Sequence, residues 1–142
     1  MAASTKVSGS CLCGAVRFEA DGPPRRVTHC HCTMCRRATG AVAGTFATWD
    51  VRDARFIGEL ARYDSSAIGW RAFCRHCGSS LSFGYKPTPE RIYVAVGILD
   101  APEKFPAAFH DHRESRVAWL DLDANLPDVA EFKSRSGDRS YG

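Results

Sequence analysis

Hydrophobic and polar positions alternate along most of the chain in short runs separated by turn-forming residues. Alternation with a period of two places apolar side chains on one face of an extended strand, and β-branched and aromatic residues favour that conformation. Runs at regular spacing are typical of an all-β sandwich, a barrel or a pair of sheets. The predicted strands cover residues 15–20, 44–51, 54–58, 60–64, 70–74, 81–85, 91–99 and 116–122.

Two short segments have the features of a helix. Residues 33–39 end before Gly40, which is suited to a left-handed C-terminal cap. Residues 126–132 carry a proline in the first turn and acidic residues near the N-terminal end. The sequence therefore predicts an all-β fold with one or two short helices.

The chain contains no repeat and no long linker rich in proline and glycine, so residues 1–142 are predicted to form one domain with flexible ends. A chain of this length can bury a sizeable core. Its three tryptophans, Trp49, Trp70 and Trp119, are expected to lie in that core.

Composition and cysteine content predict a cytoplasmic protein. Hydrophobic residues make up 44% and charged residues 25% of the chain, as in ordinary globular proteins. The polar start lacks the apolar run of a secretory signal, and no stretch approaches the ~20 apolar residues of a membrane helix. The seven cysteines are an odd number, which suits metal thiolates in a reducing compartment better than paired disulfides.

The net charge gives little support to nucleic-acid binding. The formal charge is +3. If all seven cysteines bind two zinc ions as thiolates, seven negative and four positive charges bring the sum to zero. A local basic patch is left open at Arg25-Arg26 and Arg36-Arg37, for which solvated surface arginines are the simpler interpretation.

A Cys-x-x-Cys motif at Cys74 and Cys77 is typical of a zinc knuckle, because the following Gly78 accepts the positive φ of a tight turn. A redox role is disfavoured, since the pair lies between predicted strands and not at the strand-to-helix junction of a βαβ unit. A structural zinc needs four ligands, so two more must come from elsewhere. Cys-x-Cys spacing in an extended chain puts both sulfurs on one face. Both Cys11/Cys13 and Cys30/Cys32 therefore qualify as the second pair.

The segment HCHCTMC, which begins at His29, holds five potential metal ligands. If it is extended, Cys30 and Cys32 face one side, while His29 and His31 face the other. The chain can then turn and bring Cys35 beside the other two sulfurs. This predicts three convergent thiols without an evident fourth ligand, and two histidines that are hydrogen-bonded on the back of the strand.

Three motifs, GSCLCGAVRFEADG, HCHCTMCRRATG and FCRHCGSSL, resemble in order and spacing the glutathione-dependent formaldehyde-activating enzyme family, which includes the centromere protein V type domains. The resemblance runs from about Gly9 to Pro127 and includes the tail PAAFHDHRESRVAWLDLDANLP. It implies antiparallel sheets of the β-tent type pinned by two zinc ions per chain. It also implies the ligands: Cys11, Cys13, Cys74 and Cys77 for a structural zinc, and Cys30, Cys32 and Cys35 for an active-site zinc.

The same resemblance implies a carbon–sulfur lyase of the S-(hydroxymethyl)glutathione synthase type. Glutathione or a related thiol would add to formaldehyde or a similar small aldehyde. Three thiolates leave one position of a tetrahedral zinc open, and a thiol bound there is deprotonated and nucleophilic. Candidate cationic partners for the carboxylates of the thiol are Arg36, Arg37, Lys86 and Arg116, and His110 is a candidate proton shuttle.

Two other interpretations remain open. The first is a non-catalytic, zinc-stabilised module that binds a thiol metabolite, a peptide or nucleic acid. The second is a structural zinc protein whose second site is closed by His29 or His31. A buried, hydrogen-bonded histidine is likewise an alternative for His110.

Overall fold

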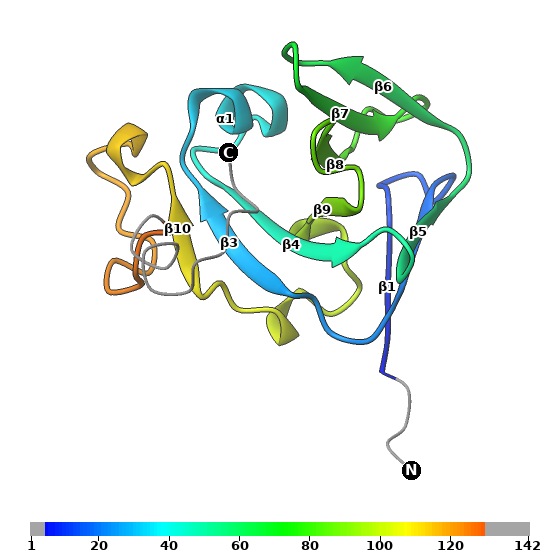
Figure 1. Ribbon diagram of the computed structural model, residues 1–142, viewed down its shortest axis with the longest axis horizontal. Coiled ribbons are helices and arrows are strands. Elements are labelled where there is room, and N and C mark those ends of the chain that lie inside the picture. Colours follow the sequence, from blue (N-terminus) through cyan, green and yellow to red (C-terminus); the bar gives the residue numbers. More distant parts are fainter. Residues whose placement is uncertain (1–4, 130–142) are drawn as a thin grey trace.

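The computed structural model describes residues 5–129, which form two β-sheets and one α-helix (Figure 1). The smaller sheet has three strands in the order β1-β2-β5, and the larger has seven in the order β10-β3-β4-β9-β8-β7-β6. In Figure 1 the two sheets meet on the side of β1 and β5, while β10 lies at the opposite edge. The strands are β1 (Lys6–Ser10), β2 (Arg17–Asp21), β3 (Arg26–Cys30), β4 (Gly44–Asp50), β5 (Ala54–Ile57), β6 (Leu60–Asp64), β7 (Gly69–Cys74), β8 (Ser80–Tyr85), β9 (Arg91–Ala95) and β10 (Phe109–Asp111).

Strand pairing brings three strand ends together at the start of the helix. Neighbouring strands pair antiparallel, except that β10 runs parallel to β3. Cys30, the last residue of β3, is aligned with Gly44 of β4 and with Asp111 of β10. Two residues separate the end of β3 from the helix α1 (Thr33–Thr39). The prediction of an all-β protein with a short helix is confirmed.

The main core lies where the two sheets pack together. Phe18 and Trp49 meet there with their ring centroids 5.3 Å apart, and Trp49 Nε1 donates a hydrogen bond to the Gly22 carbonyl at 3.1 Å. Apolar residues of both sheets surround them, because one face of each strand is apolar. The buried members are Val7, Phe18, Ala20, Val27, Ala47, Trp49, Ala54, Val94, Val96 and Leu99.

The three tryptophans differ in burial. Trp49 is buried as predicted, and Trp70 is half-buried beneath the Arg62 guanidinium, which lies 4.2 Å from its ring centroid. The prediction of a buried Trp119 is wrong, because 74% of this residue is exposed.

The segment that contains Trp119 also includes the clearest error in the predicted strands. Residues 116–122 alternate in polarity but form turns and irregular chain. Leu120 and Leu122 bend inward instead and line a small cavity beside His31 and His110. The predicted strand over 91–99 is shorter in the structure, since it continues as a 3₁₀-helix at Val96–Ile98.

The helix prediction over residues 33–39 is confirmed, and Gly40 adopts a left-handed conformation with φ 74° and donates its N–H to the Arg36 carbonyl at 2.8 Å. Residues 130–132 of the second predicted helix lie outside the described range. Within residues 5–129, the helices are too short and too polar to cross a membrane.

Candidate metal centres and the adjoining cavity

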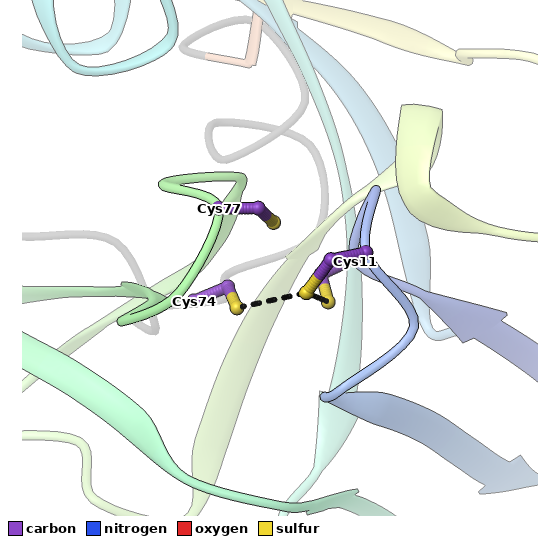
Figure 2. Close-up of side chains that lie close together, drawn as sticks. Cys11, Cys74 and Cys77 are labelled. Atoms are coloured by element: carbon purple, nitrogen blue, oxygen red, sulfur yellow. Dashed lines mark hydrogen bonds between the residues drawn. The ribbon is translucent and has the colours of Figure 1, made fainter.

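The first cysteine cluster brings together two loops that are far apart in the sequence. Cys11 and Cys13 follow β1, while Cys74 ends β7 and Cys77 lies in the turn to β8. Their four sulfurs lie within 4.8 Å of one another, and Figure 2 shows Cys11, Cys74 and Cys77 pointing toward a common centre. The Sγ–Sγ distances are 3.6 Å for Cys11–Cys13 and 3.8 Å for Cys13–Cys74. Tetrahedral zinc with Zn–S bonds of ~2.3 Å places its sulfurs about 3.8 Å apart, so the four thiols fit this ion.

Two glycines allow the chain to turn around this cluster. Gly14 and Gly78 have φ values of 80° and 77°, which side chains with a Cβ rarely adopt. Their N–H groups donate to the carbonyls of Cys11 at 3.1 Å and Cys74 at 2.8 Å, respectively. The sequence motif predicted this role for Gly78.

Polar groups of the surrounding loops are directed at the sulfurs. The backbone N–H groups of Val16 and His76 lie 3.3 and 3.4 Å from the sulfurs of Cys11 and Cys74. Two hydrogen bonds from Ser79 lower the pKa of Cys77 to about 5. The larger effect comes from the hydroxyl and the smaller from the backbone N–H. These donors stabilise thiolates, which are the form that binds zinc.

The first cluster also lies between the two sheets. β1 belongs to the smaller sheet, whereas β7 and β8 belong to the larger one. The buried side chains of Val16 and Leu81 pack beside Cys11 and Cys74. A metal bound by the four sulfurs would therefore join the two sheets.

The second cluster forms where β3 leads into α1. Cys30 ends β3, Cys32 is the N-cap of the helix, and Cys35 lies in its first turn. The three sulfurs lie within 4.8 Å of one another, and within residues 5–129 no His, Asp or Glu atom joins them at that distance. Three thiols of this kind suit a zinc ion that retains an open coordination position.

The helix start itself orients one of these sulfurs. Cys32 is extended, with φ −63° and ψ 153°, and its Sγ accepts the Cys35 N–H at 3.2 Å. Hydrogen bonds from Cys30 and Cys35 lower the pKa of Cys32 to about 2, and the same contact with Cys32 raises the pKa of Cys30 well above its usual range. One of the three thiols is therefore readily deprotonated, whereas a cation is needed to offset the charge when all three are thiolates.

The histidines of this segment face away from the sulfurs, as the alternation predicted. His29 Nδ1 lies 2.8 Å from the Thr45 hydroxyl, and its Nε2 lies 2.7 Å from the Asp123 carboxylate. His31 Nε2 lies 2.8 Å from His110 Nδ1. Neither His29 nor His31 joins the cysteine cluster, so the geometry gives no support to a second site closed by histidine.

His110 lies in the same histidine cluster behind β3 and is 2% exposed. Its Nε2 donates to the Asp123 carbonyl at 2.7 Å, and its Nδ1 lies 2.8 Å from His31 Nε2. Both ring nitrogens are thus engaged, and His110 does not line the cavity beside the second cysteine cluster. This position suits an anchor for the C-terminal segment better than a proton shuttle.

A cavity of about 270 Å³ adjoins the three cysteines. The side chains of Arg71 and Phe83 line one part of its wall, where these residues are register partners on β7 and β8. Asp111 and His112 line it at the end of β10, and His112 adopts a left-handed conformation with φ 53°. Such a backbone is uncommon for a residue other than glycine and is often found at functional sites.

The four cations predicted to bind substrate do not line this cavity. On α1, Arg36 is half-buried and Arg37 is exposed. Lys86 pairs with Asp64 at 3.4 Å, and Arg116 lines the small cavity beside the histidine cluster. Arg71 was not among the predicted site residues, but it lines the cavity and its Nη2 donates a hydrogen bond to Cys35 Sγ at 3.4 Å.

Comparisons with known proteins point to one enzyme family. The sequence model described as glutathione-dependent formaldehyde-activating enzyme matches residues 6–115. A Halomonas elongata protein, whose name assigns it provisionally to these enzymes, is 28% identical over 151 residues, covering 92% of this chain and 96% of the relative. A protein of Schizosaccharomyces pombe named as an uncharacterized lyase is 30% identical over 77 residues, covering 54% of this chain and 56% of the relative.

A crystal structure of a Rhodobacter sphaeroides protein has a similar fold, with a TM-score of 0.55 and 30% sequence identity. The similarity covers 66% of this chain and 87% of the other. The family resemblance inferred from the three cysteine motifs is thereby confirmed. The chain belongs to the glutathione-dependent formaldehyde-activating enzyme family.

Proposed function

We propose that this protein forms, or cleaves, the carbon–sulfur bond in the adduct of glutathione or a related thiol with formaldehyde or another small aldehyde. The observation that supports this function most is the difference between the two cysteine clusters. Four thiols suit a closed, structural zinc site, whereas three thiols beside a cavity leave one coordination position for a ligand. We therefore assign one zinc ion to each cluster.

The cavity size favours a small-molecule substrate. At about 270 Å³ it lies near the lower limit of small-molecule sites, which is roughly 300 Å³. Met34, Ile68 and Phe83 contribute apolar side chains to its lining. A cavity of this kind suits the thiol end of a tripeptide together with a one-carbon aldehyde.

A zinc ion held by Cys30, Cys32 and Cys35 would lower the pKa of a thiol ligand and so make it nucleophilic at neutral pH. Addition to the aldehyde forms one carbon–sulfur bond, and the proton lost by the thiol is gained by the carbonyl oxygen. Asp111 and His112 line the cavity and are placed to carry this proton.

Tyr85 also lines the cavity. Burial raises the pKa of Tyr85, so its phenol stays neutral. A neutral phenol can donate a hydrogen bond to the oxygen of the bound aldehyde. Tyr85 is therefore suited to orient the carbonyl and to stabilise the charge that develops on it.

The cysteines also bear on the compartment and on the domain organisation. All seven are free thiols, which suits a reducing compartment such as the cytoplasm. The first cluster ties the two sheets together, so we propose that residues 1–142 form one domain.

The experiment that tests this function is the rate of exchange between formaldehyde, glutathione and S-(hydroxymethyl)glutathione at equilibrium. Exchange-sensitive NMR measures it, with the uncatalysed rate subtracted. The wild-type protein is expected to accelerate exchange, while Cys32→Ser is expected to lose most of the acceleration and to retain one zinc per chain. Equal rates for the two proteins would reject catalysis and leave a binding module.

A further inference from the structure

Arg71 contacts the second cysteine cluster from the wall formed by β7 and β8. Its Nη2 donates a hydrogen bond to Cys35 Sγ at 3.4 Å. The same guanidinium lies over the Phe83 ring, with its central carbon 4.9 Å from the ring centroid. Since Arg71 and Phe83 are register partners, the cation is fixed beside the sulfurs by the strand pairing and by the ring.

The aromatic platform beneath Arg71 is itself held in place. Phe83 is buried and stacks on Tyr93, with ring centroids 4.5 Å apart and an interplanar angle of 5°. It also meets Phe46 edge-to-face, with centroids 4.8 Å apart. A guanidinium on such a support loses little further freedom when it binds a ligand or a thiolate.

The charge of the second centre gives this arginine a specific task. Three thiolates and one Zn²⁺ sum to −1, which opposes the approach of a further thiolate. The guanidinium of Arg71 offsets this charge at the sulfurs, while Asp111 adds an acidic side chain elsewhere in the cavity wall. We infer that Arg71 is a positioning residue that makes the open metal centre receptive to an anionic thiolate, in preference to a neutral ligand of similar size. This inference rests on the proposed function.

The hydrogen bond to Cys35 has a second consequence. A charge-assisted N–H···S contact reduces the electron density that the sulfur donates, and such outer contacts tune a metal centre. A metal bound by Cys35 would therefore receive less electron density from this sulfur and would accept an incoming thiolate more readily. A lysine would supply the charge without the fixed geometry of the guanidinium.

The test uses the full chain with cobalt(II) in place of zinc, because thiolate-to-cobalt absorption reports thiol binding and the cobalt d–d bands report imidazole binding. Arg71→Gln and Arg71→Lys are titrated with 2-mercaptoethanol, with glutathione and with imidazole as the neutral ligand. The matched control is Arg62→Gln. Arg62 also lies over an aromatic ring, that of Trp70, but does not line the cavity.

Arg71→Gln is expected to weaken binding of both thiols by about 10-fold and to change imidazole binding by less than about 2-fold. Arg71→Lys is expected to restore part of the thiol affinity, and Arg62→Gln is expected to behave as the wild type. If Arg71→Gln weakens the binding of glutathione but not of 2-mercaptoethanol, Arg71 contacts a carboxylate of glutathione, and the inference is overturned.

Equal thiol affinity in the wild type and in Arg71→Gln would reject this inference alone, whereas a wild type that binds neither thiol would reject the proposed function as well. The cobalt content decides a remaining case. If both Arg71 variants lose the metal of the second centre while Arg62→Gln keeps it, Arg71 holds the centre together, and its role in ligand selection is rejected.

Discussion

Cys32 is both the N-cap of the helix and a member of the second cysteine cluster. Its sulfur accepts the Cys35 N–H as an N-cap, so the local geometry that starts α1 also places Sγ beside those of Cys30 and Cys35. Because the three cysteines are neighbours in the sequence, alternation and the turn predicted that their sulfurs converge, but not that Cys32 caps the helix. The contact of Arg71 with Cys35 was not predictable in this way, since it joins residues 36 positions apart through the pairing of β7 and β8.

Gly9 provides a prediction at the scale of one residue. A Cβ at this position would lie 2.5 Å from the Ile98 carbonyl oxygen, where Gly9 of β1 forms an isolated bridge with Leu99. We expect Gly9→Ala to lower the free energy of unfolding by about 1–3 kcal/mol in urea titrations, because backbone on both sides must shift. Gly97→Ala is the control, since a Cβ there meets nothing within 4 Å. Equal stability of the two variants would contradict this close approach.

At the scale of elements, β3 presents a cysteine to the cavity on one face and a histidine to the C-terminal segment on the other. Its Cys30 faces the cavity, while His29 on the other face joins the cluster that holds His110 and the C-terminal segment. The parallel pairing with β10 continues this division, because Asp111 is aligned with Cys30 and His110 with His29. One strand thus supports the site on one face and anchors the chain on the other.

This division predicts different effects for two neighbouring histidines. His110→Gln is expected to lower the free energy of unfolding by about 1–3 kcal/mol, because buried partners lose their hydrogen bonds, and to leave the exchange rate largely unchanged. His112→Asn is expected to leave stability unchanged and to slow catalysed exchange by about 10-fold or more. Urea titration and exchange NMR on both variants measure these effects. If His110→Gln slows exchange and His112→Asn does not, His110 is the proton carrier.

The sequence predicted elements well where the determining residues are neighbours. The helix at 33–39 and its Gly40 cap depend on a few adjacent positions. The strand predicted at 116–122 is absent because alternation alone does not supply a partner strand. The two leucines of this segment, Leu120 and Leu122, instead line the small cavity beside the histidine cluster. β10 is only three residues long and pairs with a strand about 80 positions earlier, so no local pattern marks it.

At the scale of the whole molecule, the first cysteine cluster lies between the two sheets, which also meet through the core of Phe18 and Trp49. Cys74→Ser is expected to destabilise the protein by several kcal/mol, because a structural metal contributes directly to folding. Cys32→Ser is the matched substitution in the second cluster and is expected to cost much less. Urea unfolding with zinc analysis measures both effects. A Cys74→Ser variant as stable as Cys32→Ser would contradict the structural role of the first cluster.

The central claim is that the two centres differ by one open coordination position, and zinc X-ray absorption of the wild-type protein tests it most directly. Four sulfurs at one centre and three at the other average to 3.5 per zinc ion, with two zinc ions per chain. Saturation with glutathione is expected to raise this average to about 4, as a thiolate completes the second centre. An average that stays near 3.5 in the presence of glutathione, or a second centre already completed by histidine, would contradict the account.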